Sequence, residues 1–136
     1  MNTDPPQDQR RSVLLSDDST EIRGAIRAVL ESTAQFWVIG EASDGDGCLD
    51  RIRTLHPDVL ILDVNLPGGG PDLARAARRL SPNLQILVYS SNTDARTHRQ
   101  MLDAGADDYV IKTGRTRPLL DGLERAATRL QKPAPG

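Results

Sequence analysis

Short apolar runs alternate with amphipathic stretches along this chain. Each run holds three or four branched, aliphatic or aromatic residues and lacks the polar alternation of a half-exposed antiparallel strand, so it is typical of a strand buried in a parallel sheet. The five runs are residues 13–15, 37–39, 59–62, 86–89 and 109–111. The pattern therefore predicts five strands, each followed by a segment with helical periodicity.

In those segments the apolar residues are spaced so that they share one helix face. The last segment is the clearest, with Leu119, Leu123 and Ala126 on one side and charged residues on the other. The predicted faces of the third and fourth helices consist of Leu73, Ala76, Ala77 and Leu80, and of Met101, Leu102 and Gly105. Strict alternation of strand and helix favours an α/β fold, a single (βα)₅ flavodoxin-like, doubly wound parallel sheet with helices on both faces.

Composition narrows the class of protein. With 17 basic and 19 acidic residues and a formal net charge of −2, the chain lacks the excess positive charge of a globally basic nucleic-acid binder. Its one cysteine, Cys48, excludes an intrachain disulfide and a multi-cysteine metal site. The apolar runs are too short to cross a membrane and the polar first residues do not form a signal peptide, so we expect a cytoplasmic protein without a membrane partner.

The 136 residues suit one domain. Residues 1–10 are rich in proline, aspartate and glutamine and are predicted to be a disordered lead-in. The predicted domain covers residues 11–131, and residues 132–136 are expected to be a tail or the start of a linker.

Polar and charged residues follow four of the five predicted strands. Asp17 and Asp18 come after the first strand, Asp63 after the third, Ser90 after the fourth and Lys112 after the fifth. Because the carboxyl ends of parallel strands meet at one edge of the sheet, where ligands of such folds bind, these side chains are expected to converge.

Some of these residues have an ordinary structural explanation when taken alone. Asp18 could be a helix N-cap, and Ser90 could be a turn residue. Asp63 is harder to explain in this way, because it directly follows a buried run, where an unpaired carboxylate is costly. Lys112 is also unusual, because the chain has only two lysines against fifteen arginines.

Taken together, the residues suit phosphoryl chemistry. Three neighbouring carboxylates repel one another unless a cation joins them. Lys112 supplies one positive charge, and the all-oxygen ligand set suits Mg²⁺. Such a metal neutralises an incoming phosphoryl group and lets an aspartate attack phosphorus to form an acyl phosphate, whose oxygens the Ser90 hydroxyl and the Lys112 ammonium could bind.

Four segments together resemble the CheY-like response regulator receiver domain of two-component signalling: residues 13–18, 60–67, 88–91 and 104–112. The resemblance covers nearly the whole chain and fills all five positions of the family's active site. The residues after the fourth strand, with Lys112 and Thr113, are most similar to NarL-type receivers. The family implies the strand order 2-1-3-4-5.

The resemblance assigns roles by position. Asp63 matches the phosphoacceptor, and Asp18 and Asp63 match the direct Mg²⁺ ligands. Asp17 matches the residue that orients a metal-bound water, and Asn65 matches the residue that supplies a backbone carbonyl to the metal. Ser90 and Lys112 match the phosphate-contacting hydroxyl and lysine, and Tyr109 matches the switch aromatic.

The same resemblance implies partners and output. The phosphoryl donor would be a histidine kinase or phosphotransfer protein, and the chain would be a self-catalysed switch with autodephosphorylation rather than a turnover enzyme. Phosphorylation would alter the surface of the fourth helix, fifth strand and fifth helix, where a homodimer or another partner could form. DNA would be contacted only through an output domain, which is absent from this chain.

Three alternative functions are consistent with parts of this pattern. A flavin-binding flavodoxin needs a phosphate-binding loop after the first strand, where Asp17 and Asp18 place negative charge. A haloacid dehalogenase-type phosphohydrolase needs an acid/base at the position of Asn65. A degenerate receiver, which binds partners without phosphorylation, stays open because Ser91 could narrow access to the site.

The remaining features have ordinary explanations. The glycine run at residues 68–70 is expected to loosen the loop after Asp63. Arg75, Arg78 and Arg79 are expected to form a solvated helix face. His98 is expected to lie on the surface of a polar helix, and Cys48 is expected to be a small core residue.

Overall fold

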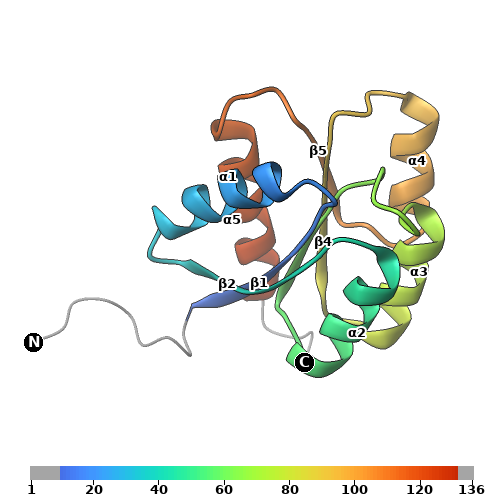
Figure 1. Cartoon of the computed structure of the whole chain (residues 1–136), viewed down its shortest axis with the longest axis horizontal. Coiled ribbons are helices and arrows are strands. Elements are labelled where there is room, and N and C mark those ends of the chain that lie inside the picture. The colour runs from blue at the N-terminus through green and yellow to red at the C-terminus, as the bar shows by residue number, and fades with distance from the viewer. Residues whose placement is uncertain (1–9, 132–136) are drawn as a thin grey trace, which may run out of the picture.

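The computed structural model of the chain describes residues 10–131. The predicted lead-in, apart from Arg10, and the predicted tail lie outside the described residues. Strands and helices alternate throughout this range, as predicted (Figure 1). The elements are β1 (Arg11–Ser16), α1 (Thr20–Glu31), β2 (Phe36–Ala42), α2 (Gly45–Leu55), β3 (Val59–Leu62), α3 (Pro71–Leu80), β4 (Gln85–Ser90), α4 (Ala95–Asp103), β5 (Asp108–Ile111) and α5 (Arg117–Gln131). No helix between residues 10 and 131 is long and apolar enough to span a membrane.

The five strands are parallel and lie in the order β2-β1-β3-β4-β5, which confirms the predicted order. β1 and β3 are neighbours, and their register pairs Ser16 with Leu62. β3 pairs Leu62 with Val88 of β4, and β4 pairs Ser90 with Ile111 of β5. The residues that follow these positions therefore emerge from the sheet at the same edge.

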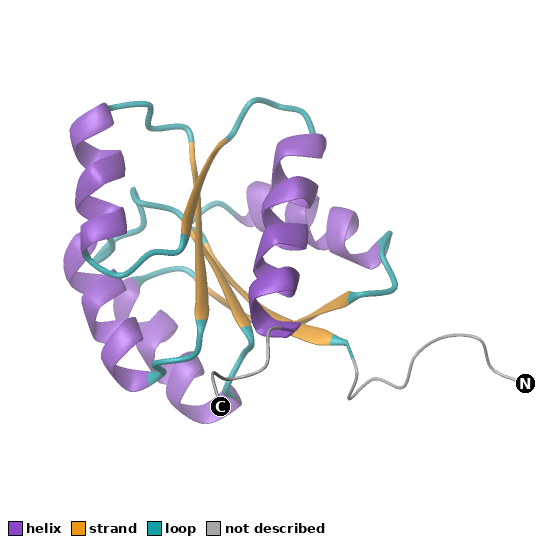
Figure 2. Cartoon of the chain, turned by 180° about the vertical axis from the view of Figure 1, so that it is seen from behind, coloured by secondary structure: helices purple, strands orange, loops and turns teal. Residues whose placement is uncertain are grey.

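Helices cover both faces of the sheet (Figures 1 and 2). α2, α3 and α4 pack on one face, against strand residues such as Leu14, Leu60 and Ile86. α1 and α5 pack on the other face, against strand residues such as Val13 and Ile61. Successive side chains of a strand point to opposite faces, so a strand covered on both faces, such as β3, is buried and apolar along its whole length.

The apolar faces of α3 and α4 differ from the predicted ones. Leu80, predicted to face the core, is 42% exposed, whereas Ala74 is buried. In α4, Met101 is fully buried but Leu102 is 40% exposed. Gly105 lies beyond the end of α4 with a φ of 117°, a positive value that favours glycine, so it follows the helix instead of packing within it.

The prediction that Arg78 lies on a solvated helix face is wrong, although Arg75 and Arg79 are exposed as predicted. The Arg78 guanidinium donates to three backbone carbonyl oxygens and one carboxylate: those of Pro82 (2.9 Å), Leu84 (2.6 Å), Gly105 (2.7 Å) and Asp107 (2.7 Å). Asp107 also accepts a hydrogen bond from the Ile86 backbone N–H at 2.8 Å. Arg78 therefore ties α3 to the segments that precede β4 and β5, at the sheet edge opposite the strands' carboxyl ends.

Replacing Arg78 by alanine is expected to lower the free energy of unfolding by about 2 kcal/mol, because it leaves several partly buried acceptors without a donor. Urea denaturation would measure the change. Arg79→Ala, at an exposed position of the same helix, is the matched control and should change it by less than about 0.5 kcal/mol. Equal losses in the two variants would show that the Arg78 contacts do not stabilise the fold.

Candidate functional site

Three carboxylates converge where the strands end. Asp17 and Asp18 begin the segment after β1, and Asp63 directly follows β3, so the neighbouring strands bring them together. Carboxylate oxygens of all three residues lie within 4.8 Å of one another. Asp17 and Asp63 are only 3% and 6% exposed, whereas Asp18 is exposed. The site is thus two buried carboxylates with a third at the solvent boundary.

Lys112 reaches this cluster from the end of β5. Its Nζ lies 2.7 Å from Asp17 Oδ2 and 3.1 Å from Asp63 Oδ2, so one ammonium bridges both buried carboxylates. Burial lowers the pKa of Lys112, but the hydrogen bonds and negative charges of Asp17 and Asp63 outweigh it and hold that pKa above its ordinary value. The ammonium therefore stays charged at neutral pH.

Local hydrogen bonds orient Asp17. Its backbone N–H donates to the Ala42 carbonyl at 3.1 Å, and its Oδ1 accepts from the Ser19 N–H at 2.9 Å. Ser19 is also the N-cap of α1, because its hydroxyl accepts from the Ile22 N–H at 3.1 Å. Asp18 is therefore not the helix cap that its sequence position alone suggested.

Arg23 supports the same segment, and the sequence pattern did not reveal it. Its Nη1 donates to the Asp17 carbonyl oxygen at 2.6 Å, and its Nε donates to Glu41 Oε1 at 2.9 Å. The hydrogen bond from Arg27, together with that from Arg23, outweighs burial and lowers the pKa of Glu41. Glu41 lies 18 residues away from Arg23, on β2, so the residue spacing within a helix could not predict this ion pair.

The loop after Asp63 is held against α2. Asn65 donates its backbone N–H to Asp63 Oδ1 at 3.1 Å, and the Pro67 carbonyl accepts from the Gly45 N–H at 2.8 Å. A Cβ on Gly45 would lie 2.5 Å from the Gly68 carbonyl oxygen, so only glycine allows so close an approach of the two backbones. The glycine-rich loop therefore packs closely against α2, which the sequence pattern did not reveal.

Ser90 and Tyr109 are linked through the backbone of Asn92. Ser90 is fully buried, and its hydroxyl accepts from the Asn92 N–H at 3.2 Å. The Tyr109 hydroxyl donates to the Asn92 carbonyl at 2.8 Å. Burial raises the pKa of Tyr109, and the negative charges of Asp63 and Asp94 add to this, while the nearby Ser90 hydroxyl opposes it. The phenol is thus half-buried, and its pKa is raised mainly by that burial.

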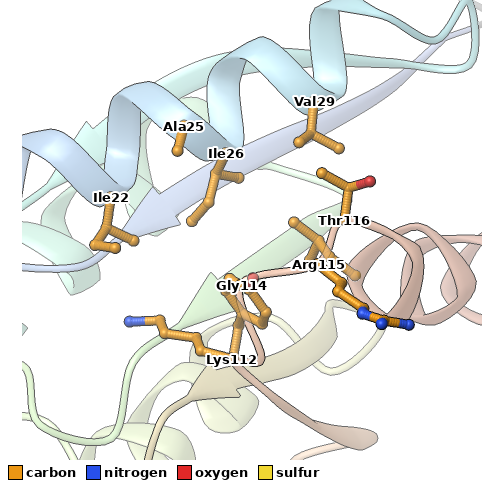
Figure 3. Close-up of a pocket in the computed structure, with 10 residues that line it drawn as sticks. Ile22, Ala25, Ile26, Val29, Lys112, Gly114, Arg115 and Thr116 are labelled. Atoms are coloured by element: carbon orange, nitrogen blue, oxygen red, sulfur yellow. The ribbon is translucent and has the colours of Figure 1, made fainter.

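An apolar pocket of about 180 Å³ lies beside Lys112, between α1 and the segment that joins β5 to α5 (Figure 3). Ile22 and Val29 line it from α1, and Tyr89 lies below Lys112, with its ring centroid 5.6 Å from the Lys112 Nζ. In Figure 3 the ammonium points away from Arg115. The hydrocarbon part of Lys112 therefore lines the pocket while its charged end reaches the carboxylates.

Cys48 is fully buried on α2, as expected for a core residue. Burial raises the pKa of its thiol to about 11. Because the thiolate is the reactive form, we expect the folded protein to react with an aromatic disulfide reagent at pH 8 roughly tenfold or more slowly than the urea-unfolded chain. Absorbance of the released thiolate would follow the reaction. Equal rates would mean that the thiol is accessible in the folded state.

Comparison with known proteins identifies the family. The sequence profile of the response regulator receiver domain matches residues 13–124. The nitrate/nitrite response regulator protein NarL of Escherichia coli (strain K12) is 31% identical over 117 residues, which is 85% of this chain and 54% of NarL. A protein-glutamate methylesterase/protein-glutamine glutaminase 1 of Rhizobium johnstonii is 38% identical over 126 residues, 88% of this chain and 36% of that protein. The chain thus spans about half the length of NarL.

Solved structures agree with the sequence relatives. The signal receiver domain of the putative response regulator NarL from Mycobacterium tuberculosis has a TM-score of 0.80 and 28% identity, and the match covers 88% of this chain and 98% of that one. The solved structure thus supports the same family as the sequence relatives do. The chain belongs to the response regulator receiver domain family, and it is similar to NarL-type members.

Proposed function

We propose that the chain is a phosphoacceptor switch in which Asp63 takes a phosphoryl group from a histidine kinase or phosphotransfer protein. A carboxylate oxygen attacks phosphorus, the bond to the donor's histidine nitrogen breaks with its electron pair going to nitrogen, and an acyl phosphate forms. The observation that carries this proposal is the contact of the buried Asp63 carboxylate with Lys112 inside a cluster of three carboxylates. The switch also catalyses its own dephosphorylation and does not turn over a substrate.

We propose that Lys112 and Ser90 bind the transferred group. The Lys112 ammonium is already 3.1 Å from Asp63, so it lies within reach of an oxygen on phosphorus bonded there. The Ser90 hydroxyl accepts a hydrogen bond from the Asn92 N–H and therefore keeps its own proton available for donation. The two residues can thus share the negative charge of the phosphoryl oxygens.

The carboxylate cluster fits Mg²⁺, which prefers oxygen ligands and retains several waters. Three carboxylate oxygens lie close together, and Asp18 at the solvent boundary leaves room for those waters. We propose Asp18, Asp63 and the Asn65 backbone carbonyl as direct ligands, with Asp17 orienting a metal-bound water. The bound ion would neutralise charge on the transferring phosphoryl group.

Asp18→Ala is expected to weaken Mg²⁺ binding roughly tenfold or more, and Asp17→Ala to weaken it less, because Asp18 is proposed to bind the ion directly and Asp17 only through a metal-bound water. Calorimetric titration with MgCl₂ would measure both affinities. Asp72→Ala, an exposed carboxylate on α3, serves as the charge control. If Asp17→Ala has the larger effect, the proposed division of roles is wrong.

We further propose that phosphorylation changes the surface formed by α4, β5 and α5, with Ser90 and Tyr109 as the switch residues. A partner protein or a second copy of the chain would dock there. We place the folded receiver at residues 11–131. The chain covers about half of NarL, and any contact with DNA would come from a separate output domain.

Incubation with acetyl phosphate and Mg²⁺ would test the proposed function. Intact-mass measurement is expected to show one added phosphoryl group per chain, and excess EDTA is expected to prevent the addition. Absence of the adduct would support a receiver that works without phosphorylation, and labelling that persists in EDTA would contradict the role of the metal.

A further inference from the structure

Tyr109 contacts α4 through a second aromatic ring. The imidazole of His98 stacks on the phenol ring with 4.6 Å between the ring centroids and 18° between the planes. His98 is exposed on α4, one helical turn before the buried Met101. The stack therefore lies at the outer edge of the contact between α4 and β5, where it adds little to the core.

The opposite end of the Tyr109 side chain is tied to the segment between β4 and α4. Its hydroxyl donates to the Asn92 carbonyl, while the Asn92 N–H donates to Ser90. The Asn92 side chain in turn accepts from the backbone N–H of Asp94, whose carboxylate caps α4. Tyr109 is thus fixed at its hydroxyl to the Ser90 segment and on its ring face to α4.

We infer that His98 is a positioning residue, which holds the Tyr109 ring against α4 so that the tyrosine and the helix change position together. The inference rests on the proposed phosphoacceptor function and adds the residue through which the switch reaches α4. If Ser90 moves toward Asp63 to donate its proton to a phosphoryl oxygen, its hydrogen bond from the Asn92 N–H changes, and with it the position of the Asn92 carbonyl that accepts from the Tyr109 hydroxyl. The stack would then carry the displacement of Tyr109 to α4.

Three variants of the full chain separate stacking from other effects of His98. His98→Ala removes the ring, His98→Phe keeps an aromatic face, and Arg99→Ala changes the next exposed residue of the same helix. Removing the stack should lower the ratio of Tyr109 rings packed against α4 to rings turned away from it by roughly two- to tenfold. Because His98 is exposed, none of the changes opens the core.

NMR would measure the chemical shifts of the Tyr109 ring and the α4 amides, with and without beryllofluoride and Mg²⁺. In His98→Ala the Tyr109 ring signals should lose the upfield shift caused by the imidazole, and the beryllofluoride response of the α4 amides should shrink at least twofold. His98→Phe and Arg99→Ala should keep both.

Wild-type signals in His98→Ala, or a His98→Phe variant that behaves like His98→Ala, would overturn the inference. Failure of the proposed function gives a different result, because the wild type would then take no phosphoryl group from acetyl phosphate. In that event the Tyr109 ring shifts of the variants measured without beryllofluoride still show whether His98 positions the tyrosine.

Discussion

Asp63→Asn is expected to reduce phosphoryl incorporation from acetyl phosphate to background. The amide has nearly the shape of the carboxylate and can still accept the hydrogen bond from the Asn65 N–H, so the fold should be retained. A neutral amide, however, has no anionic oxygen to attack phosphorus. Intact mass would give the incorporation, and peptide mapping would locate the group on the wild-type chain.

Asp72→Asn is the matched control for this experiment, because it removes a carboxylate that is exposed on α3. It should take up phosphate like the wild type. Equal labelling of Asp63→Asn and wild type would show that the phosphoacceptor is another residue.

Lys112→Met is expected to lower the free energy of unfolding by about 3 kcal/mol at neutral pH without Mg²⁺. The side chains of Lys112, Asp17 and Asp63 are at most 15% exposed, so removing the ammonium leaves two buried carboxylates that face each other without a counter-charge. The same loss should slow phosphoryl incorporation, because Lys112 is also proposed to bind the phosphoryl oxygens. Added Mg²⁺ should restore part of the stability, because it supplies the missing positive charge.

Urea denaturation with and without MgCl₂ would measure these changes. Arg115→Met removes a positive charge from the same segment, at an exposed position, and should change stability by less than about 0.5 kcal/mol. A Lys112→Met variant as stable as Arg115→Met would mean that the ammonium does not offset the repulsion between the carboxylates.

The five strands and the acidic cluster could both be anticipated from the sequence pattern, whereas the strand order followed only from the resemblance to the receiver family. Buried parallel strands need apolar residues on both faces, so the five strands stand out as continuous apolar runs. Parallel strands also end at the same edge, so Asp17, Asp63 and Lys112 could be placed together from their positions alone. The structure brings these three residues into contact.

The contacts that support the site could not be anticipated, because they join residues far apart in the sequence. Arg78 meets Gly105 at a separation of 27 residues, and Arg23 meets Glu41 at 18. An arginine on a helix face has the same appearance in the sequence whether water or a carbonyl group receives its hydrogen bonds. The stack of His98 on Tyr109 was missed for the same reason.

Helical periodicity predicted only part of the buried faces of α3 and α4 correctly. It identifies residues on the same side of a helix but not how far the core extends along that side. Leu80 is the last residue of α3 and Leu102 lies near the end of α4, and both have the predicted apolar character while remaining substantially exposed.

The Arg78 contacts limit how α4 can move. The C-terminal end of α4 leads directly into Gly105, whose carbonyl Arg78 binds, whereas the N-terminal end is joined to the Ser90 segment. A helix secured at one end responds to a displacement at the other by tilting, not by sliding. Phosphorylation at Asp63 should therefore displace α4 most near Asp94 and least near Ala104. A partner that distinguishes the two states should do so best by contacting the first turn of the helix.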